Sequence, residues 1–138
     1  MNKKVNYGKI LSFIFLLSIF VFPNAARAEG ELKSVYRQYT AAINNLDVEQ
    51  FKQNMAAEVV AKVNATTQDQ IRSEMEAMKR LSNKDVAVIE EKIDEDKGVL
   101  SLTGTNNLTG IKQNGTVYLA KENGQWKIKK EVWSNPGN

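Results

Sequence analysis

Few side chains in this sequence belong to types that perform chemistry on a substrate. The 138 residues include no histidine and no cysteine, so the usual proton shuttle and the usual thiol nucleophile are both absent. The sequence also lacks a glycine-rich phosphate loop, a spaced set of metal ligands and a nucleophile with a base beside it. These absences favour a non-catalytic role, and we predict neither a cofactor nor a metal site.

Tyr36 and Tyr39 are candidates for ligand contact, because both lie on the apolar face of a predicted helix. Their hydroxyls could point into a pocket and bind the polar group of a ligand. Such tyrosines are more often core aromatics with a satisfied hydroxyl. Both interpretations stay open from the sequence.

Carboxylates offer a second chemistry. An isomerase- or dehydratase-like enzyme would pair a pocket tyrosine with an acid such as Glu58, Glu90 or Glu91, buried so that its pKa is raised. The acidic run at 94–96 suggests calcium, but it lacks the spaced ligands and the distal glutamate of a calcium loop. We interpret that run as a solvated turn.

Trp133 is the candidate for an interaction surface. In a regular strand over residues 125–133, Trp126 and Ile128 share one face with Val132, and Trp133 falls on the opposite face. A tryptophan on an outer face suits a protein partner or a dimer contact. The alternative, packing under the chain end, is equally compatible with the pattern. Lys130 interrupts the apolar face.

The elements that position these side chains are three helices followed by four strands. Runs rich in β-branched and alternating residues predict strands over 86–93, 99–105, 116–121 and 125–133. Asn114-Gly115 and Asn123-Gly124 are strong hairpin signals and predict tight turns. Residues 94–98 supply the remaining turn, with Gly98 as its flexible residue. Glycines 104 and 110 indicate a bulge or bend.

Apolar residues at helical spacing predict the first helix over 32–44 and a second from residue 48 that frays or bends near Ala56-Ala57. Asp47 with Gln50 and Thr67 with Gln70 have the spacing of capping boxes. The second pair predicts the start of a helix that ends near residue 81.

Residues 1–28 have the features of a secretory signal peptide. Three lysines precede thirteen uncharged residues at 10–22, and Ala26-Arg27-Ala28 presents small residues at the positions that signal peptidase reads. The apolar run is too short for a spanning helix, so we expect no stable membrane anchor. We predict cleavage after Ala28 and export to the periplasm or the extracellular space. The remaining chain is predicted to be one domain over 29–133 with a flexible tail at 134–138.

Cleavage changes the charge of the protein. Four of the 19 basic residues and none of the 16 acidic residues lie in 1–28. The mature chain therefore carries 15 basic and 16 acidic residues, and its net charge is −1. A protein of this charge has no electrostatic signature of nucleic-acid binding.

Four features of the chain form a recognisable set: the order of helices and strands, the Tyr36/Tyr39 helix, the step from Asn45 to Asp47 and the closing NGQWKI hairpin. Together they resemble the nuclear-transport-factor-two-like (NTF2-like) superfamily. This superfamily includes SnoaL-like and ketosteroid-isomerase-like domains, and the resemblance is to its small exported bacterial members. It implies an α+β fold in which N-terminal helices pack on a curved antiparallel four-stranded sheet, forming a cone with a pocket at its open end. It also implies homodimers through the outer sheet face.

Catalytic residues of the superfamily do not carry over. The dehydratase branch uses a histidine, which this chain lacks, and Asp85, Asp94 and Asp96 fall in predicted turns rather than at the aspartate positions of the isomerase branch. The sequence therefore favours an exported binding or interaction module with a pocket for a small apolar ligand. The alternatives are a small isomerase- or dehydratase-like enzyme and an inhibitor or immunity-type protein with a protein partner.

Overall fold

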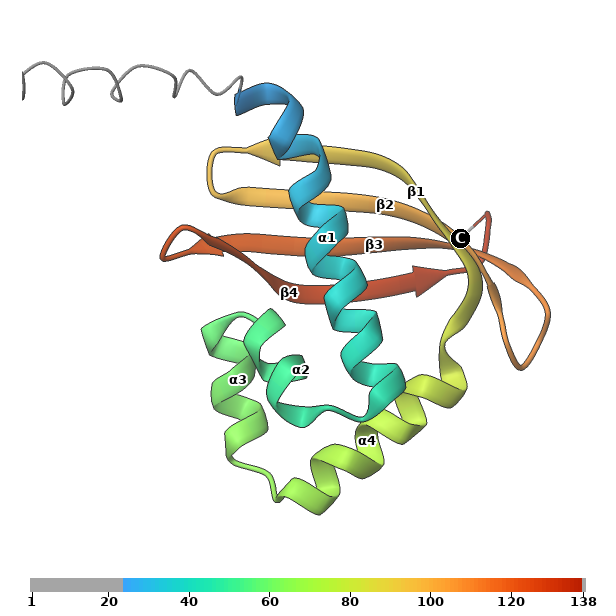
Figure 1. Ribbon diagram of the computed structural model, residues 1–138. Helices are drawn as coiled ribbons and strands as arrows, with labels where there is room; N and C mark the ends of the chain where they lie inside the picture. Colours follow the sequence, from blue (N-terminus) through green and yellow to red (C-terminus); the bar gives the residue numbers. More distant parts are fainter. Residues whose placement is uncertain (1–23, 138) are drawn as a thin grey trace, which may run out of the picture.

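A computed structural model describes the backbone of residues 24–137 and the side chains of residues 30–137. Its elements follow one another in the order α1 (Asn24–Asn45), α2 (Val48–Asn54), α3 (Ala57–Asn64), α4 (Gln68–Leu81), β1 (Asn83–Asp94), β2 (Lys97–Asn106), β3 (Lys112–Glu122) and β4 (Gln125–Ser134). The four strands form one antiparallel sheet in sequence order. Helix α1 crosses one face of this curved sheet, and the other three helices gather near the end of α1 (Figure 1). The predicted α+β class, with helices on a curved antiparallel sheet, is confirmed.

Most of the predicted signal peptide, residues 1–23, lies outside the described residues. The predicted cleavage point after Ala28 lies within the first turns of α1. Among the described residues, no helix is both long and apolar enough to cross a bilayer.

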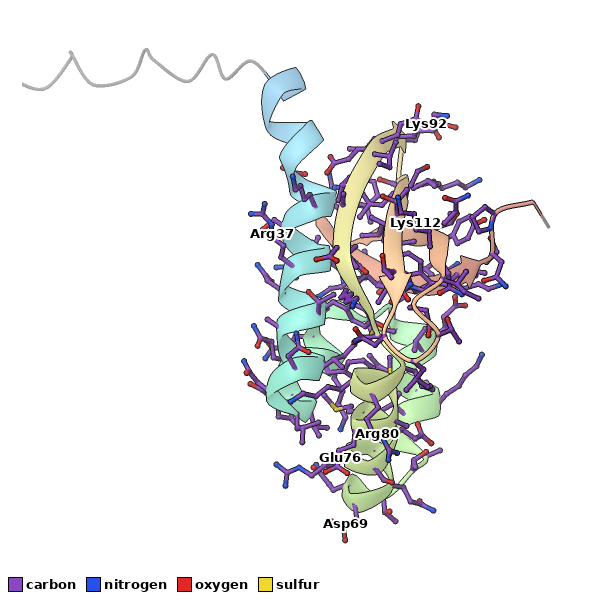
Figure 2. All side chains as sticks on the ribbon, turned by 90° about the vertical axis from the view of Figure 1, so that its right-hand side faces the viewer. Arg37, Asp69, Glu76, Arg80, Lys92 and Lys112 are labelled. Carbon is purple, nitrogen blue, oxygen red and sulfur yellow. The ribbon has the colours of Figure 1, made fainter. Side chains whose placement is uncertain are left out.

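The core lies between α1 and the sheet. The apolar stripe of α1 is buried, as its spacing predicted, and it meets the inward side chains of the central strands. The buried cluster contains Leu32, Tyr36, Tyr39, Ala42, Ile43, Phe51, Ile71, Met75, Leu100, Leu102, Val117, Leu119, Trp126 and Ile128. The opposite side of α4 faces solvent, with Glu76 and Arg80 pointing outward (Figure 2). Burial of one face of each element is what fixes the sheet register.

Helix starts follow the predicted capping residues. The Asp47 carboxylate accepts a hydrogen bond from the Gln50 amide at 3.0 Å, and Thr67 and Gln70 form a complete capping box. The second predicted helix, expected to fray or bend near residue 56, is divided into two helices by a break there, because α2 ends at Asn54 and α3 begins at Ala57. The Ala56 amide in this break donates to the Ile128 carbonyl at 2.8 Å, which ties the helical end of the molecule to β4.

One of the two predicted Asn-Gly turns is correct. Asn123 and Gly124 both have positive φ, 49° and 78°, as a two-residue type I′ hairpin requires. The prediction for Asn114-Gly115 is wrong, because both residues lie inside β3. The actual turn after β2 is organised by the Asn106 side chain, which accepts hydrogen bonds from the amides of Leu108 and Thr109.

Glycines inside the strands make room for other side chains. Gly98, predicted as a turn residue, lies in β2, where a Cβ atom would come within 2.9 Å of Leu32 and 3.3 Å of Trp126. Gly115 takes up a similar role beneath Trp133, where a Cβ atom would lie 2.8 Å from the ring. Contacts closer than 3.0 Å would force the neighbouring groups to shift, so glycine at these two positions serves packing rather than chain reversal.

The predicted alternation of β4 is wrong beyond Ile128. The register steps from Leu119 opposite Ile128 to Tyr118 opposite Lys130, so Lys129 is an extra residue with no partner in β3. Such a bulge reverses which residues face the core. Glu131 and Trp133 therefore point to the same face as Trp126 and Ile128, whereas Val132 is exposed.

Candidate functional site

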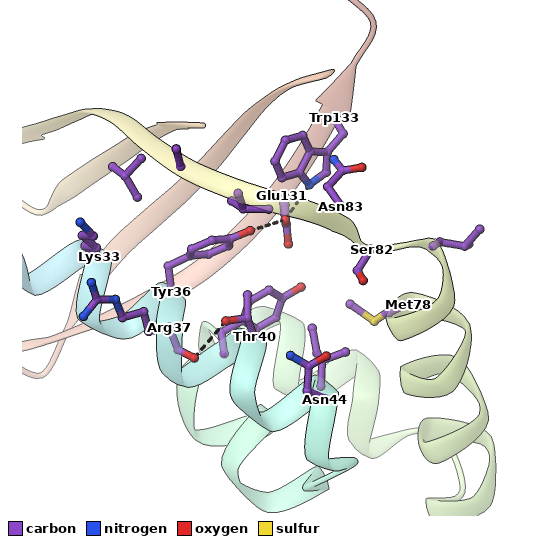
Figure 3. Close-up of a pocket in the computed structure, with 16 residues that line it drawn as sticks. Lys33, Tyr36, Arg37, Thr40, Asn44, Met78, Ser82, Asn83, Glu131 and Trp133 are labelled. Atoms are coloured by element: carbon purple, nitrogen blue, oxygen red, sulfur yellow. Dashed lines mark hydrogen bonds between the residues drawn. The ribbon is translucent and has the colours of Figure 1, made fainter. Parts of the chain in front are cut away.

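A pocket of about 800 Å³ opens between α1, the end of α4, the start of β1 and the end of β4. Figure 3 shows how these elements surround it. Aliphatic and aromatic side chains make up most of its wall, and Lys33 and Arg37 lie at its rim. Its lining includes Lys33, Tyr36, Arg37, Tyr39, Thr40, Ile43, Met78, Asn83, Val86, Val88, Glu131 and Trp133.

The two tyrosines enter the pocket wall from α1. They are spaced to lie on one helix face, and both are almost fully buried. Their rings lie 6.1 Å apart, and the Tyr39 ring stacks on Phe51 at 5.7 Å. Core packing therefore holds both rings in place, while the residues also line the cavity. The two residues are therefore core aromatics, and their contact with a ligand stays a prediction.

Glu131 is the central polar group of the pocket, and sequence reasoning did not identify it. Its Oε1 atom accepts a hydrogen bond from the Tyr36 hydroxyl at 3.0 Å and another from the Trp133 indole N–H at 2.7 Å (Figure 3). The side chain is half-buried. One residue in the sequence could have revealed Glu131. Lys130 places a charge in the predicted apolar face of the strand, and the bulge at Lys129 accounts for this charge because it changes the face on which Lys130 and the residues after it lie.

The charge of Glu131 acts on both tyrosines. Burial raises the pKa of Tyr36 well above its ordinary value of 10.0, and the charge and hydrogen bond of Glu131 raise that pKa further. Burial is also the main cause of the raised pKa of Tyr39, with the nearby Glu131 carboxylate second. Both phenols therefore stay protonated at neutral pH and act as hydrogen-bond donors.

Trp133 lies against the sheet rather than on its outer surface. Cβ atoms built at Gly104 and Gly115 would come within 3.2 Å and 2.8 Å of its ring, so the indole lies over two adjacent strands where side chains are missing. This packing fixes the direction of the indole N–H toward Glu131. It also removes the side chain from the outer face on which the sequence placed it.

The other candidate acids lie elsewhere. Glu58 and Glu90 are exposed, and they form ion pairs with Lys129 and Lys92 at 3.2 Å each. Glu91 is half-buried and accepts a hydrogen bond from the Lys33 amide at 3.2 Å. The acidic run at 94–96 forms the exposed end of the β1–β2 hairpin. Among the described residues, no group of acidic side chains is arranged to hold a metal ion.

Asn83 adds a further acceptor to the pocket wall. Its Oδ1 atom is buried and has no hydrogen-bond donor among the described residues. A buried acceptor without a donor costs about 1–3 kcal/mol. The pocket therefore holds more acceptor capacity than the surrounding side chains satisfy.

No protein-family model matches the chain, and no curated protein matches it. Several solved structures are similar to it, among them two bacterial ones. A SEC-C motif containing protein from Rhodopseudomonas palustris shares 15% identity over 78% of this chain and 83% of its own, with a TM-score of 0.56. An NTF-2 like protein of unknown function from Silicibacter pomeroyi shares 12% identity over 83% of this chain and 99% of its own, with a TM-score of 0.53. The NTF2-like fold implied by the sequence resemblance is confirmed, and at these identities the likeness concerns the fold alone.

Proposed function

We propose that this NTF2-like chain is an exported, non-catalytic binding module that holds a small, largely apolar ligand between α1 and the sheet. The single observation that carries the proposal is the pocket around Glu131. Its volume of about 800 Å³ falls within the range of roughly 300–1,000 Å³ found for small-molecule sites. Apolar walls with a few convergent polar groups are also typical of such sites.

The hydrogen bonds of the pocket favour binding over catalysis. The Tyr36 hydroxyl and the Trp133 indole both donate to Glu131, so these groups hold one another in place. A general acid works best when its pKa lies near the operating pH, and the pKa values of Tyr36 and Tyr39 are raised away from neutrality. Fixed donors and a fixed acceptor suit recognition of a ligand.

One observation, the contact between Glu131 and Tyr36, favours the enzyme alternative. Glu131 and Tyr36 form the carboxylate–tyrosine pair that an isomerase-like or dehydratase-like mechanism would need, at 3.0 Å and inside a pocket. In that reaction the carboxylate would remove a proton and the phenol would donate to the developing oxyanion. This role requires Tyr36 to release Glu131 and turn to the substrate.

The protein-partner alternative loses its main residue, because Trp133 lies on the inner face of the sheet. A homodimer through the outer face would instead use the exposed Tyr118 and Val132. Sedimentation velocity on the mature chain tests for this homodimer, and a monomer that persists at high concentration would exclude it.

Export rests on the predicted signal peptide at 1–28. Cleavage after Ala28 leaves Glu31, whose Oε2 atom accepts a hydrogen bond from the Trp126 indole at 3.1 Å, and the buried Leu32. The contacts of α1 with the sheet are therefore compatible with processing. Edman sequencing of the secreted protein should begin at Glu29, and a chain that keeps residue 1 would contradict this part of the proposal.

Native mass spectrometry of the mature protein from its own export compartment tests the binding function. The proposal predicts an additional mass that stays bound under native conditions and leaves on denaturation. A clean monomer or dimer mass would contradict it. Turnover of a bound compound by the wild type, lost in Glu131→Gln, would instead favour the enzyme alternative.

A further inference from the structure

We infer that the ligand is an organic cation, an apolar body with a protonated amine whose ammonium group binds Glu131. This inference rests on the proposed binding function and adds the chemical class of the ligand. It is carried by the charge of Glu131, the positions of the neighbouring lysines and the aromatic wall.

Glu131 takes part in no ion pair among the described side chains. The ion pairs of this part of the chain join Lys52 to Glu49, Lys92 to Glu90 and Lys129 to Glu58. The Tyr36 hydroxyl and the Trp133 indole, which donate to its Oε1 atom, are neutral groups, and so is the Tyr39 phenol, which also hydrogen-bonds to this carboxylate. A half-buried carboxylate gains most from a cationic donor, because charge-assisted hydrogen bonds are about twice as strong as neutral ones.

The lysines nearest to Glu131 in sequence are directed elsewhere by the bulge. Lys129 pairs with Glu58 at 3.2 Å, and Lys130 is exposed opposite Tyr118 in β3. The Lys127 ammonium donates to the Gln53 carbonyl. Three lysines of β4 thus leave the carboxylate without a cation, although they lie within four residues of it.

The wall around the carboxylate is suited to a positive charge. Tyr36, Tyr39 and Trp133 all line the pocket, and aromatic faces attract cations within about 6 Å. Trp133 is held over Gly104 and Gly115, so its ring and its N–H have a fixed orientation. A ligand ammonium beside Glu131 would meet a rigid aromatic surface.

The remaining walls and the rim define the rest of the ligand. Aliphatic side chains such as Ile43, Met78 and Val88 line the volume beyond Glu131, which suits an apolar body. Lys33 and Arg37 lie on the side of the pocket away from Glu131 (Figure 3). Their positive charges favour an orientation in which the ammonium points inward to Glu131.

Three probes with one apolar chain and different head groups test the inference. Hexylammonium, 1-hexanol and hexanoate are titrated into the ¹⁵N-labelled mature protein at pH 7. The readout is the Trp133 indole N–H resonance, which reports directly on Glu131. Trp126→Phe identifies that resonance, because Trp126 lies outside this pocket and bonds to Glu31.

We expect hexylammonium to bind about tenfold or more tightly than 1-hexanol, as one charge-assisted hydrogen bond implies, and hexanoate to bind most weakly. In Glu131→Gln the amide oxygen still accepts from Tyr36 and Trp133, and the preference for the amine should disappear. Glu58→Gln removes the same charge from the exposed surface and should keep the preference.

Equal affinities of the wild type for the amine and the alcohol would overturn the inference and leave the binding function standing. A preference that persists in Glu131→Gln would also overturn it. If none of the three probes moves the Trp133 resonance, the proposed binding function fails together with the inference. The affinities of the wild type for the three probes test the inference even if Glu131→Gln does not fold.

Discussion

Trp133 donates its indole N–H to Glu131, two residues earlier on the same strand, at 2.7 Å. The two side chains can meet because residues i and i+2 of a strand share one face. That face is the inner one only because Lys129 is an extra residue in β4. One inserted residue therefore brings a carboxylate and a tryptophan into the pocket, where the strict alternation would have left them in solvent.

Deletion of Lys129 should remove the bulge and leave Glu131 and Trp133 on the inner face. Glu131 then follows Ile128 by two residues, and residues at this spacing share one face of a regular strand. The Trp133 side chain should therefore stay as inaccessible to water as in the wild type. Acrylamide quenching of tryptophan fluorescence measures this access and should be equal in the deletion variant and the wild type. In Lys129→Ala the residue count is kept and only an exposed ion pair is lost, worth about 0–1 kcal/mol. A clear change of quenching in the deletion variant would contradict the assignment of the bulge, because deletion from a strictly alternating strand reverses the face of every later residue.

Gly115→Ala should destabilise the protein by about 1–3 kcal/mol, the usual cost of overpacking. The new methyl group would lie 2.8 Å from the Trp133 ring, so the ring or the strand has to move. Urea unfolding gives the free energy of unfolding for comparison with the wild type. Gly30→Ala is the matched control, because a Cβ atom there has no neighbour within 4 Å. A Gly115→Ala variant as stable as the wild type would show that Trp133 does not lie over this glycine.

Alkaline pH should destabilise the fold through Tyr36 and Tyr39. Their folded-state pKa values are raised, so above about pH 10 the unfolded chain releases phenol protons that the folded chain retains. The stabilisation is complete below pH 10, and each tyrosine then costs about 1.4 kcal/mol per additional pH unit. Unfolding curves between pH 9 and 11 should therefore fall more steeply for the wild type than for Tyr36→Phe or Tyr39→Phe. Parallel curves would exclude the raised pKa values.

Thr40→Trp should block the pocket. Thr40 lines the cavity from α1 and is half-buried, so a large ring at this position would occupy the volume proposed for the ligand. Native mass spectrometry of this variant should show at least a tenfold smaller fraction of ligand-bound protein than the wild type. Ala41→Trp places the same ring on the exposed side of the same helix and should keep the bound mass. Undiminished binding in Thr40→Trp would locate the ligand elsewhere.

Local signals in the sequence were sufficient for most of the fold. The Thr67/Gln70 box and the Asn123-Gly124 turn depend on residues within three positions of each other, and both were predicted correctly. Gly115 was misinterpreted because its role comes from a ring on another strand. A glycine that makes space and a glycine that makes a turn are identical in sequence.

The candidate site was predicted only in part, for the same physical reason. Tyr36, Tyr39 and Trp133 were singled out, and all three line one pocket. Glu131 was missed because its direction depends on the bulge at Lys129, and one extra residue reverses the faces of everything that follows. The lysine at position 130 was the available clue, since a charge in an apolar face of a strand can mark a change of phase.

A crystal structure of the protein purified from its native source would show whether the pocket around Glu131 binds a small ligand. We expect density for a compact apolar molecule between α1 and β4, with a donor group within hydrogen-bond distance of the Glu131 carboxylate. A pocket that holds only water, or one closed by its own side chains, would contradict the proposed function.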